Sequence, residues 1–529
     1  MVDKLRTASR FTGGLQRFLA SRLSQSNCHN LVTEQLDGRQ DSFLQLMQEG
    51  VFNNPASPYL PLLRKVGVSF ADLASAVRRE GIEATLGMLF DQGVWVTLDE
   101  FKGRVPLERT GLHLNTTDRH FDNPLISRHF SLRTGGSRSR GTLLYIEFDL
   151  VEYEAAQDRL FLDAFDLIHR PMAIWRPVPP GSAGIKGVLR RAKLGLRLDH
   201  WFSQNSLSAA PSQFGYLGVT CLSVLSAKAR GLRIPLPEHV PLPAAAKVAR
   251  WLAVMTAEGT PALVDTIVSS GVRICLAARD QGLDIRGTFF RCGGEPLTPA
   301  KSQVIEDAGG RVVCHYAMAE LGRIGIACAT AEHIDEVHIL GDKVGVIQRA
   351  KTVGEASVPA LFLTSIHASS PKLALNVESG DYGVLTERDC GCPMSQIGYH
   401  QHAHTIRSYE KLTTEGMHFL GHELVVLIEE VLPAQFGGAP TDYQMVEAEE
   451  QGMTKIRLIV SPRVGPIDET AVVSCLLETL GGTSPGMKMM ADHWRQGETL
   501  QVIREEPHLT AGAKIQALHA PTRAEGDSR

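Results

Sequence analysis

The spacing of apolar residues divides the chain into a helical beginning and a mixed middle. Residues 1–55 are polar and are expected to be helical, and residues 61–94 carry apolar side chains at helical spacing, with glycines at the breaks. From residue 143 the pattern changes, because LLYIEFDL and MAIWRPV predict short strands and FLDAFDLIH between them predicts a helix. We therefore expect helices first and strands mainly from about residue 143 onward.

A regular alternation of helices and strands follows in the middle of the chain. The segments ALVDTIVSSG, VRICLAARDQGL and GTFFRCGG alternate in this way, and KSQVIEDAGG followed by RVVCHYAM repeats a helix, a glycine stop and a strand. Such alternation is typical of a layered α/β core in which at least some strands are parallel.

The pattern changes again near residues 405–411. Beyond this point KLTTEGMHF, the amphipathic HELVVLIEEVL, TKIRLIVSP and the helical AVVSCLLETL indicate an α+β segment. The sequence thus predicts a helical segment over 1–55, a large domain over 56–406, a small domain over 407–518 and a disordered tail over 519–529.

The composition indicates the broad class of the protein but does not indicate its function. A chain of 529 residues with 43% hydrophobic and 21% charged residues is an ordinary globular protein of two or three domains. The net charge of −4 and the pI near 6.6 give no indication of a nucleic-acid or membrane partner. The basic N-terminus lacks the apolar centre of a secretory signal, and no apolar run approaches the roughly 20 residues that cross a bilayer. Nine cysteines, an odd and mostly isolated set, fit free thiols in the cytoplasm.

The stretch SLRTGGSRSRGT (131–142) has the chemistry of a phosphate-binding loop. Paired glycines let the backbone approach an anion, and hydroxyl groups can donate to phosphate oxygens. The residues concerned are Thr134, Gly135, Gly136, Ser137 and Ser139. The stretch matches neither GxxxxGK[ST] nor GxGxxG, and on its own composition a polar turn between two strands is the more common interpretation.

Three further turns follow predicted strands: RCGGEPLT (291–298), CHYAMAELG (314–322) and NVESGDYG (376–383). In an open α/β sheet, ligands bind at the carboxyl ends of strands, so these turns are expected to line one crevice. Their chemistry suits a nucleotide. Glycine backbone and Tyr316 would contact a flat base, Asp381 would bind ribose hydroxyls, and Glu320 would hold a divalent cation.

The order of these motifs resembles the adenylate-forming (AMP-binding) superfamily, and within it the branch of phenylacetate–CoA ligases and acyl-protein synthetases. The matching features are the loop at 134–142, a GGEP-type adenine turn at 293–296, a YGxTE-type motif at 316–320 and a ribose-binding GD at 380–381. A hinge arginine, Arg407, and a C-terminal lysine, Lys514 in TAGAK, complete the series. The sequence departs from the family at Ser139, Ala317 and Ala319.

The resemblance implies a large N-terminal α/β domain with layered sheets and a small mobile C-terminal α+β lid. It implies ATP-dependent activation of a carboxylic acid to an acyl-adenylate, followed by thioester formation with CoA, as in an AMP-forming acid–thiol ligase. Lys514 would bridge carboxylate and α-phosphate, Glu320 would hold Mg²⁺, and the lid would turn about Arg407. The residues assigned to the nucleotide are Thr134, Gly135, Gly136, Ser137, Ser139, Gly293, Gly294, Glu295, Tyr316 and Asp381.

Two other functions stay open at this point. The acyl group could pass to the phosphopantetheine arm of an acyl carrier protein or to a protein thiol instead of CoA. A nucleotide-binding pseudoenzyme is also compatible with the sequence, because Ala319 lacks the hydroxyl that the family motif carries. The substrate is expected to be a small carboxylic acid, with neither nucleic acid nor membrane as partner, and the oligomeric state, a dimer included, stays open.

A second group of residues has the composition of a zinc site. Cys390 and Cys392 in DCGCP, with Cys328 and a histidine from ACATAEHIDEVHIL, would supply one imidazole and three thiolates in a closed tetrahedron. By resemblance to members of the same branch, His338 rather than His333 is the matching histidine. Reduced, unpaired thiols are the alternative.

The neighbouring HQHAH places three histidines at alternate positions of a predicted strand. We expect His400, His402 and His404 to form a solvated or interdomain polar face.

Overall fold

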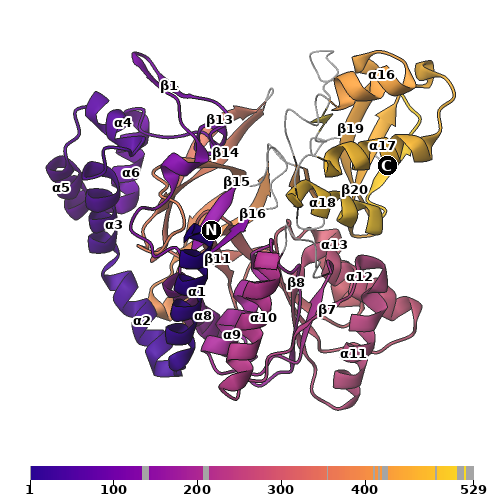
Figure 1. Cartoon of the computed structure of the whole chain (residues 1–529), viewed down its shortest axis with the longest axis horizontal. Helices are drawn as coiled ribbons and strands as arrows, with labels where there is room; N and C mark the ends of the chain where they lie inside the picture. Colours follow the sequence, from indigo (N-terminus) through magenta and orange to yellow (C-terminus); the bar gives the residue numbers. More distant parts are fainter. Residues whose placement is uncertain are drawn as a thin grey trace.

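The fold was obtained as a computed structural model of the whole chain (Figure 1). The structure describes residues 2–133, 142–206, 214–353, 356–408, 412–414, 417–419, 427–482, 485–508 and 518–519. No helix in these ranges is long and apolar enough to cross a lipid bilayer.

The chain begins with a series of helices, as the apolar spacing predicted. They are α1 (Val2–Ala20), α2 (Gln25–Asp37), α3 (Arg39–Met47), α4 (Tyr59–Lys65), α5 (Phe70–Glu80), α6 (Ile82–Asp91) and the short α7 (Leu98–Phe101). The N-terminal basic segment belongs to the folded body, because the rings of Phe11 and Phe18 lie 5.8 and 5.1 Å from that of Phe148 in α8 (Phe148–Ala164). Its apolar face is therefore used for packing.

The core is a sheet of twelve strands in the order β13-β14-β15-β16-β12-β11-β10-β9-β8-β5-β6-β7. Neighbours from β7 to β10 are parallel, and neighbours from β10 to β13 are antiparallel. The α/β class with partly parallel strands is thus confirmed. The strands are β5 (Met172–Trp175), β6 (His200–Ser203), β7 (Pro237–His239), β8 (Leu263–Ile267), β9 (Phe289–Gly293), β10 (Arg311–Met318), β11 (Gly322–Ala327), β12 (Val337–Ile339), β13 (Val344–Val353), β14 (Ala356–Ser365), β15 (Val377–Glu387) and β16 (Gln401–Ser408).

Helices cover both faces of the parallel half of the sheet, which explains the unbroken apolar run in β5. Met172 and Ile174 pack with α8 and α9 (Ala183–Lys193). Ala173 and Trp175 point the other way, to α11 (Ala245–Ala257) and α12 (Val268–Asp280). Since side chains of a strand alternate between faces, a strand buried on both sides needs apolar residues at every position.

The small C-terminal domain has its own sheet, β21-β20-β19-β22, and its own apolar core (Figure 1, upper right). Asp468 caps its helix α17 (Glu469–Gly481) by accepting from the backbone N–H groups of Thr470 and Ala471, at 2.9 and 3.1 Å. The other elements here are α16 (Leu432–Phe436), β19 (Tyr443–Glu450), β20 (Met453–Val460), α18 (Pro485–Gln496), β21 (Leu500–Ile503) and β22 (Leu518–His519). A large α/β domain followed by a smaller α+β domain is the predicted architecture.

Candidate active site

The ends of three parallel strands meet at one edge of the sheet. Ile267 at the end of β8, Gly293 at the end of β9 and His315 in β10 are in register. A Cβ atom at Gly293 would lie 3.0 Å from the carbonyl oxygen of His315, and Gly294 has a φ of +91°. Both glycines are therefore required by the backbone, whatever they contact in a ligand.

Glu295, the third residue of this turn, is buried and supports the neighbouring helix. Its carboxylate accepts from the backbone N–H of Ser269 at 3.1 Å and from the Ser269 hydroxyl at 2.8 Å, at the start of α12. Lys301 lies 3.9 Å from the same carboxylate. Negative charge at a helix N-terminus is favourable, so Glu295 stabilises the start of α12.

Two of the residues assigned to a nucleotide touch each other. The Tyr316 hydroxyl donates to Asp381 Oδ2 at 2.9 Å, which joins β10 to β15 across the intervening strands. Burial, with the Asp381 carboxylate as the next cause, raises the pKa of Tyr316 well above its ordinary value. The hydroxyl of Tyr316 therefore stays protonated and remains a donor, and it holds the aspartate next to the aromatic ring.

Glu320 lies between β10 and β11 and is buried, with 2% of its surface exposed. It forms an ion pair with Lys102, which follows α7, and the Lys102 ammonium also lies 3.4 Å from the Thr142 hydroxyl. Thr142 is the last residue of the glycine-rich stretch 131–142. Sequence reasoning missed Lys102, because a lysine in FKGRVP has no motif around it.

Arg407 lies on β16 beside the strand that carries Asp381. Tyr382 pairs with Arg407 and Asp381 pairs with Ser408 across β15 and β16. The Arg407 guanidinium donates to Asp335 Oδ2 at 2.7 Å, and Asp335 Oδ1 accepts from the backbone N–H of Thr405 at 3.0 Å. Thr405 has a φ of +54°, an unusual value for a β-branched residue, so Asp335 holds a strained backbone immediately before the predicted hinge.

Six of the predicted site residues lie outside the described part of the chain. The structure therefore places neither the phosphate loop nor the C-terminal lysine. These residues are Thr134, Gly135, Gly136, Ser137, Ser139 and Lys514.

A buried ion network lies behind this edge of the sheet. Glu154 of α8 accepts from Lys186 at 3.0 Å, Arg190 at 3.2 Å and Lys343 at 3.3 Å. A Cβ atom at Gly322, two residues after Glu320, would lie 2.5 Å from Glu154 Oε1. Burial alone would raise the pKa of Glu154, but the surrounding cations hold it well below its ordinary value. Sequence patterns did not reveal this network, because its members come from separate helices and strands.

The small domain docks on the large domain close to Glu295. Lys301, in α13 (Pro299–Asp307), donates to the Thr454 hydroxyl of β20 at 2.7 Å, and both side chains are buried. Met453 packs into the core around α11 and α12. A Cβ atom at Gly452 would lie 3.0 Å from Val304 Cγ2, so the hairpin between β19 and β20 approaches α13 closely.

The four predicted zinc ligands converge. Potential donor atoms of Cys328, His338, Cys390 and Cys392 all lie within 4.8 Å of one another. The Cys328 and Cys390 sulfurs are 3.7 Å apart, and His338 Nε2 is 3.2 Å from the sulfur of Cys392. His338 Nδ1 lies 2.8 Å from the Tyr399 carbonyl oxygen, which leaves Nε2 free to face the thiols. Hydrogen bonds from the Cys328 thiol and then from His338 hold the pKa of Cys392 well below its ordinary value.

The expectation for HQHAH is wrong at its central residue. His402 is fully buried, because β16 pairs with β12 inside the sheet and sets His402 opposite His338. Its Nδ1 lies 2.7 Å from Glu336 Oε1. His404 instead stacks on His333, with ring centroids 3.7 Å apart, so His333 lies outside the four-residue cluster.

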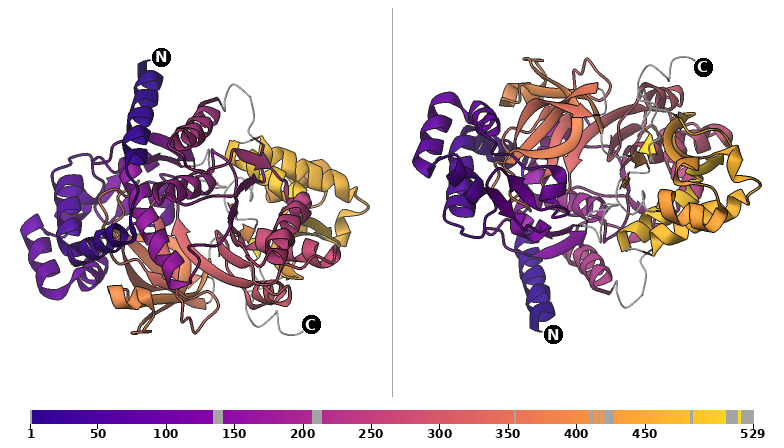
Figure 2. Two further views of the ribbon diagram at one scale, coloured as in Figure 1. Left: turned by 90° about the horizontal axis from the view of Figure 1, so that it is seen from below. Right: turned by 90° about the horizontal axis from the view of Figure 1, so that it is seen from above.

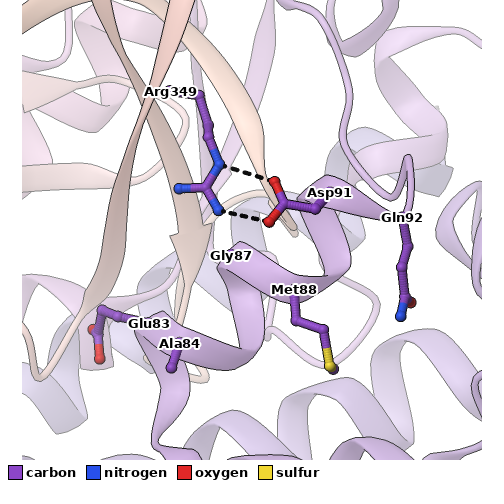
Figure 3. Close-up of a pocket in the computed structure, with 7 residues that line it drawn as sticks. All are labelled: Glu83, Ala84, Gly87, Met88, Asp91, Gln92 and Arg349. Atoms are coloured by element: carbon purple, nitrogen blue, oxygen red, sulfur yellow. Dashed lines mark hydrogen bonds and ion pairs between the residues drawn. The ribbon is translucent and has the colours of Figure 1, made fainter.

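A separate hollow lies on the surface of the N-terminal helices. Figure 3 shows it on α6, with Arg349 of β13 reaching Asp91 at 3.3 Å. None of the predicted site residues lines it. Its lining consists of Glu83, Ala84, Gly87, Met88, Asp91, Gln92 and Arg349.

No protein-family model and no curated protein matches the sequence. Among solved structures, the fold is similar to that of 2-hydroxyisobutyryl-CoA ligase in complex with 2-HIB-AMP and CoA in the thioesterification state. The TM-score is 0.51 at 15% identity, covering 92% of this chain and 90% of that chain. Acetoacetyl-CoA synthetase from Streptomyces lividans matches with a TM-score of 0.33 at 13% identity, over 74% of this chain and 55% of that chain. A fatty acyl-adenylate ligase from L. pneumophila matches with a TM-score of 0.35 at 12% identity, over 90% and 88% of the two chains.

The first of these structures shares its architecture with this chain over nearly its whole length. The chain therefore has the same fold as 2-hydroxyisobutyryl-CoA ligase.

Proposed function

We propose that the protein is an AMP-forming acid–thiol ligase. The observation that carries the proposal is the contact of Tyr316 with Asp381 at the edge of the sheet where Gly293, Gly294 and Glu320 also lie. An aromatic ring, a glycine backbone and a carboxylate are the groups that a base and a ribose require. The resemblance of the motif order and the fold support the same conclusion.

The proposed reaction has two steps. A carboxylate oxygen of the acid attacks the α-phosphorus of ATP, the bond to the bridging oxygen of the β-phosphate breaks, and pyrophosphate leaves. The sulfur of a thiol, which loses its proton, then attacks the acyl carbon, and AMP leaves as the carbon–oxygen bond breaks. Both steps bring negative groups together, so cations and donors aimed at that charge lower the barrier.

Each described residue has a role in this scheme. Tyr316 and the turn at Gly293 and Gly294 contact the base, and Asp381 accepts from the ribose hydroxyls. Glu320 offers a buried carboxylate oxygen, the type of ligand that Mg²⁺ prefers, and Mg²⁺ there would neutralise phosphate charge. Glu295 acts indirectly, by holding the start of α12.

The domain boundary near Arg407 also belongs to the proposal. The last described residue of β16 is Ser408, one position after Arg407, and the small domain lies beyond it. The lid would turn about this point, bringing Lys514 to the carboxylate and α-phosphate for the first step and moving it away for the second.

We also propose that Cys328, His338, Cys390 and Cys392 hold a structural Zn²⁺. Three sulfurs and one imidazole nitrogen in one buried cluster are the donor set of a closed tetrahedral site. The hydrogen bond of His338 Nδ1 to a backbone carbonyl is the outer contact that orients a metal-bound imidazole.

The test of the proposed activity is a panel of carboxylic acids with ATP, Mg²⁺ and hydroxylamine. Hydroxylamine traps any acyl-adenylate as a hydroxamate, whatever the natural acceptor is. We expect hydroxamate with at least one acid, and lower formation in Asp381→Ala. Asp284→Ala, at an exposed turn remote from the site, serves as the matched control.

CoA or a holo carrier protein added in place of hydroxylamine identifies the thiol that accepts the acyl group. Absence of hydroxamate and of released pyrophosphate with every acid would contradict the proposal and favour a pseudoenzyme.

A further inference from the structure

Two long stretches of the chain contain no aspartate or glutamate. The first extends from Lys4 to Thr33 and the second from His200 to Pro237, although 58 of the 529 residues are acidic. Both stretches contain arginines and lysines. The net charge of the whole chain is −4, but each of these two segments carries only positive charges.

The structure brings these two stretches together. Helix α1 belongs to the first, helix α10 (Phe214–Ala229) belongs to the second, and the two pack against each other. The Arg22 guanidinium donates to the Arg230 carbonyl oxygen at 3.4 Å. Figure 2 shows α1 projecting from the body of the molecule, with the magenta helix α10 beside it.

The positive side chains at this junction have no carboxylate partner among the described residues. Arg22, Lys228 and Arg233 are exposed, and Arg230 is half-buried. Two carboxylates of neighbouring elements are already paired: Asp199, just before β6, lies 2.5 Å from Arg197, and Glu152 of α8 lies 3.0 Å from Lys193.

The outer side of α10 is apolar. No charged residue occurs from Phe214 to Ala227, and Gly218, Leu222 and Leu225 follow each other at the spacing of one helical face. Leu225 is 56% exposed, whereas Leu222 is partly buried against the core. A surface helix of a globular domain normally turns polar residues outward, so an exposed Leu225 on a face without charged residues is unusual.

We propose that the face formed by α1 and α10 docks on an anionic lipid surface. We call it the α1–α10 face and define it by Arg22, Leu225, Lys228, Arg230 and Arg233. Cations without a carboxylate partner beside the exposed Leu225 are the combination that binds a lipid interface, where the cations meet phosphate headgroups and the leucine enters the acyl boundary. A nucleic acid would match the charge but would leave Leu225 in water. The two helices would lie on the membrane without crossing it.

Vesicle sedimentation tests this proposal with the full chain. One set of vesicles contains phosphatidylcholine alone, and the other replaces about a third of it by phosphatidylglycerol. We expect binding to the anionic vesicles only, and loss of this binding at about 0.5 M salt, because salt screens the attraction. Failure of the wild-type protein to bind anionic vesicles would overturn the proposal, whatever its enzymatic activity.

Three variants locate the binding surface. The triple variant Arg22→Gln, Arg230→Gln, Arg233→Gln removes three cations and should weaken binding about 100-fold, at roughly fivefold for each charge. Leu225→Gln removes the exposed apolar contact and should weaken binding without a change of charge. The matched control is Arg250→Gln, Arg279→Gln, Arg286→Gln, which makes the same change of charge on the exposed side of α11, α12 and the turn after it.

The outcomes are decisive in both directions. Weak binding in the first triple variant and in Leu225→Gln, with normal binding in the control, supports the proposal. Equal loss in both triple variants would show a general effect of charge and would overturn it. Tighter binding to duplex DNA or to polyglutamate than to anionic vesicles would also overturn it, in favour of those partners. If the first triple variant melts at a lower temperature, Lys228→Gln and Leu225→Gln supply the same comparison.

Discussion

Lys102 and Glu320 form a buried ion pair next to Thr142, at the end of the glycine-rich stretch. At the scale of single residues this pair joins two motifs that are far apart in the sequence. Glu320 is the proposed Mg²⁺ ligand, so Lys102 is a positioning residue for it. Groups that orient a metal ligand typically contribute 10- to 100-fold to metal affinity or activity.

We therefore expect Lys102→Met to lower the rate of hydroxamate formation about 10- to 100-fold. Lys102→Arg, which keeps the charge, should retain more activity than Lys102→Met. Lys65→Met, at an exposed position of α4, is the control and should behave as the wild type. A wild-type rate in Lys102→Met would remove Lys102 from the site.

Glu154 is the residue whose loss should affect stability most. Its neutralisation in Glu154→Gln removes the carboxylate from buried Lys186 and Lys343 and leaves Arg190 with Asp158 alone, which costs about 3–5 kcal/mol of unfolding free energy. Glu80→Gln breaks an exposed ion pair with Arg79 and should cost about 0–1 kcal/mol. Urea unfolding of the two variants measures the difference. Similar losses in both would contradict the role assigned to the buried network.

The pKa of Glu154 also sets the pH at which this stability is present. Because the folded pKa is held well below the unfolded value of about 4.3, the contribution is complete above that value. It is lost as the pH falls through the folded pKa. The penalty of Glu154→Gln should therefore be largest near neutral pH and should shrink as the pH is lowered below about 4.

At the scale of elements, the proposed zinc would join the segment after β11, which carries Cys328, to the segment before β16, which carries Cys390 and Cys392. We expect the stability of both segments to depend on this ion. Cys390→Ser should lower the zinc content from one ion per chain and lower the melting temperature, because a closed zinc site contributes folding energy. Cys475→Ser, on α17 outside the cluster, should change neither. Metal analysis of the purified protein makes the measurement, and a full melting temperature in a zinc-free protein would contradict a structural role.

Strands and their turns explain why much of the site could be predicted. Short, mainly apolar strand patterns that follow glycine stops indicated β9 and β10 in the sequence, and with them Gly293 and Tyr316. The CxC motif and a preceding histidine likewise indicated the cysteine cluster. Lys102, Asp335 and Glu154 could not be found in this way, because each acts through a partner far away in the sequence. His402 was misjudged because its burial depends on the pairing of β12 with β16.

At the scale of the whole molecule, polar contacts at several points hold the small domain on the large domain, among them Arg273 with the Gly497 carbonyl oxygen and His493 with Asn205. Lys301 joins the carboxylate of Glu295 to Thr454 of the small domain. Thr454→Val removes one buried hydrogen bond and should loosen this docking without unfolding either domain. We expect faster hydrogen exchange in the hairpin between β19 and β20, and unchanged exchange in β5 and β8. Unchanged hydrogen exchange in the hairpin would show that the hydrogen bond between Lys301 and Thr454 does not fix the orientation of the small domain.

The net charge of the whole chain was a poor guide to the partners of the protein. A net charge of −4 argued against a membrane partner, yet the acid-free stretches converge on one side of the molecule. Net charge sums over all surfaces, whereas a docking surface depends on the charges that the fold brings together. The fold class, in contrast, followed from the alternation of helices and strands alone.

Photolabelling with 8-azido-ATP tests the central claim most directly, because the label reacts where the adenine base lies. We predict that it modifies the peptide around Gly293 and Gly294 or the peptide that contains Tyr316, and that excess ATP prevents this. Labelling that is confined to another part of the protein, such as the hollow around Arg349, would contradict the proposed nucleotide site.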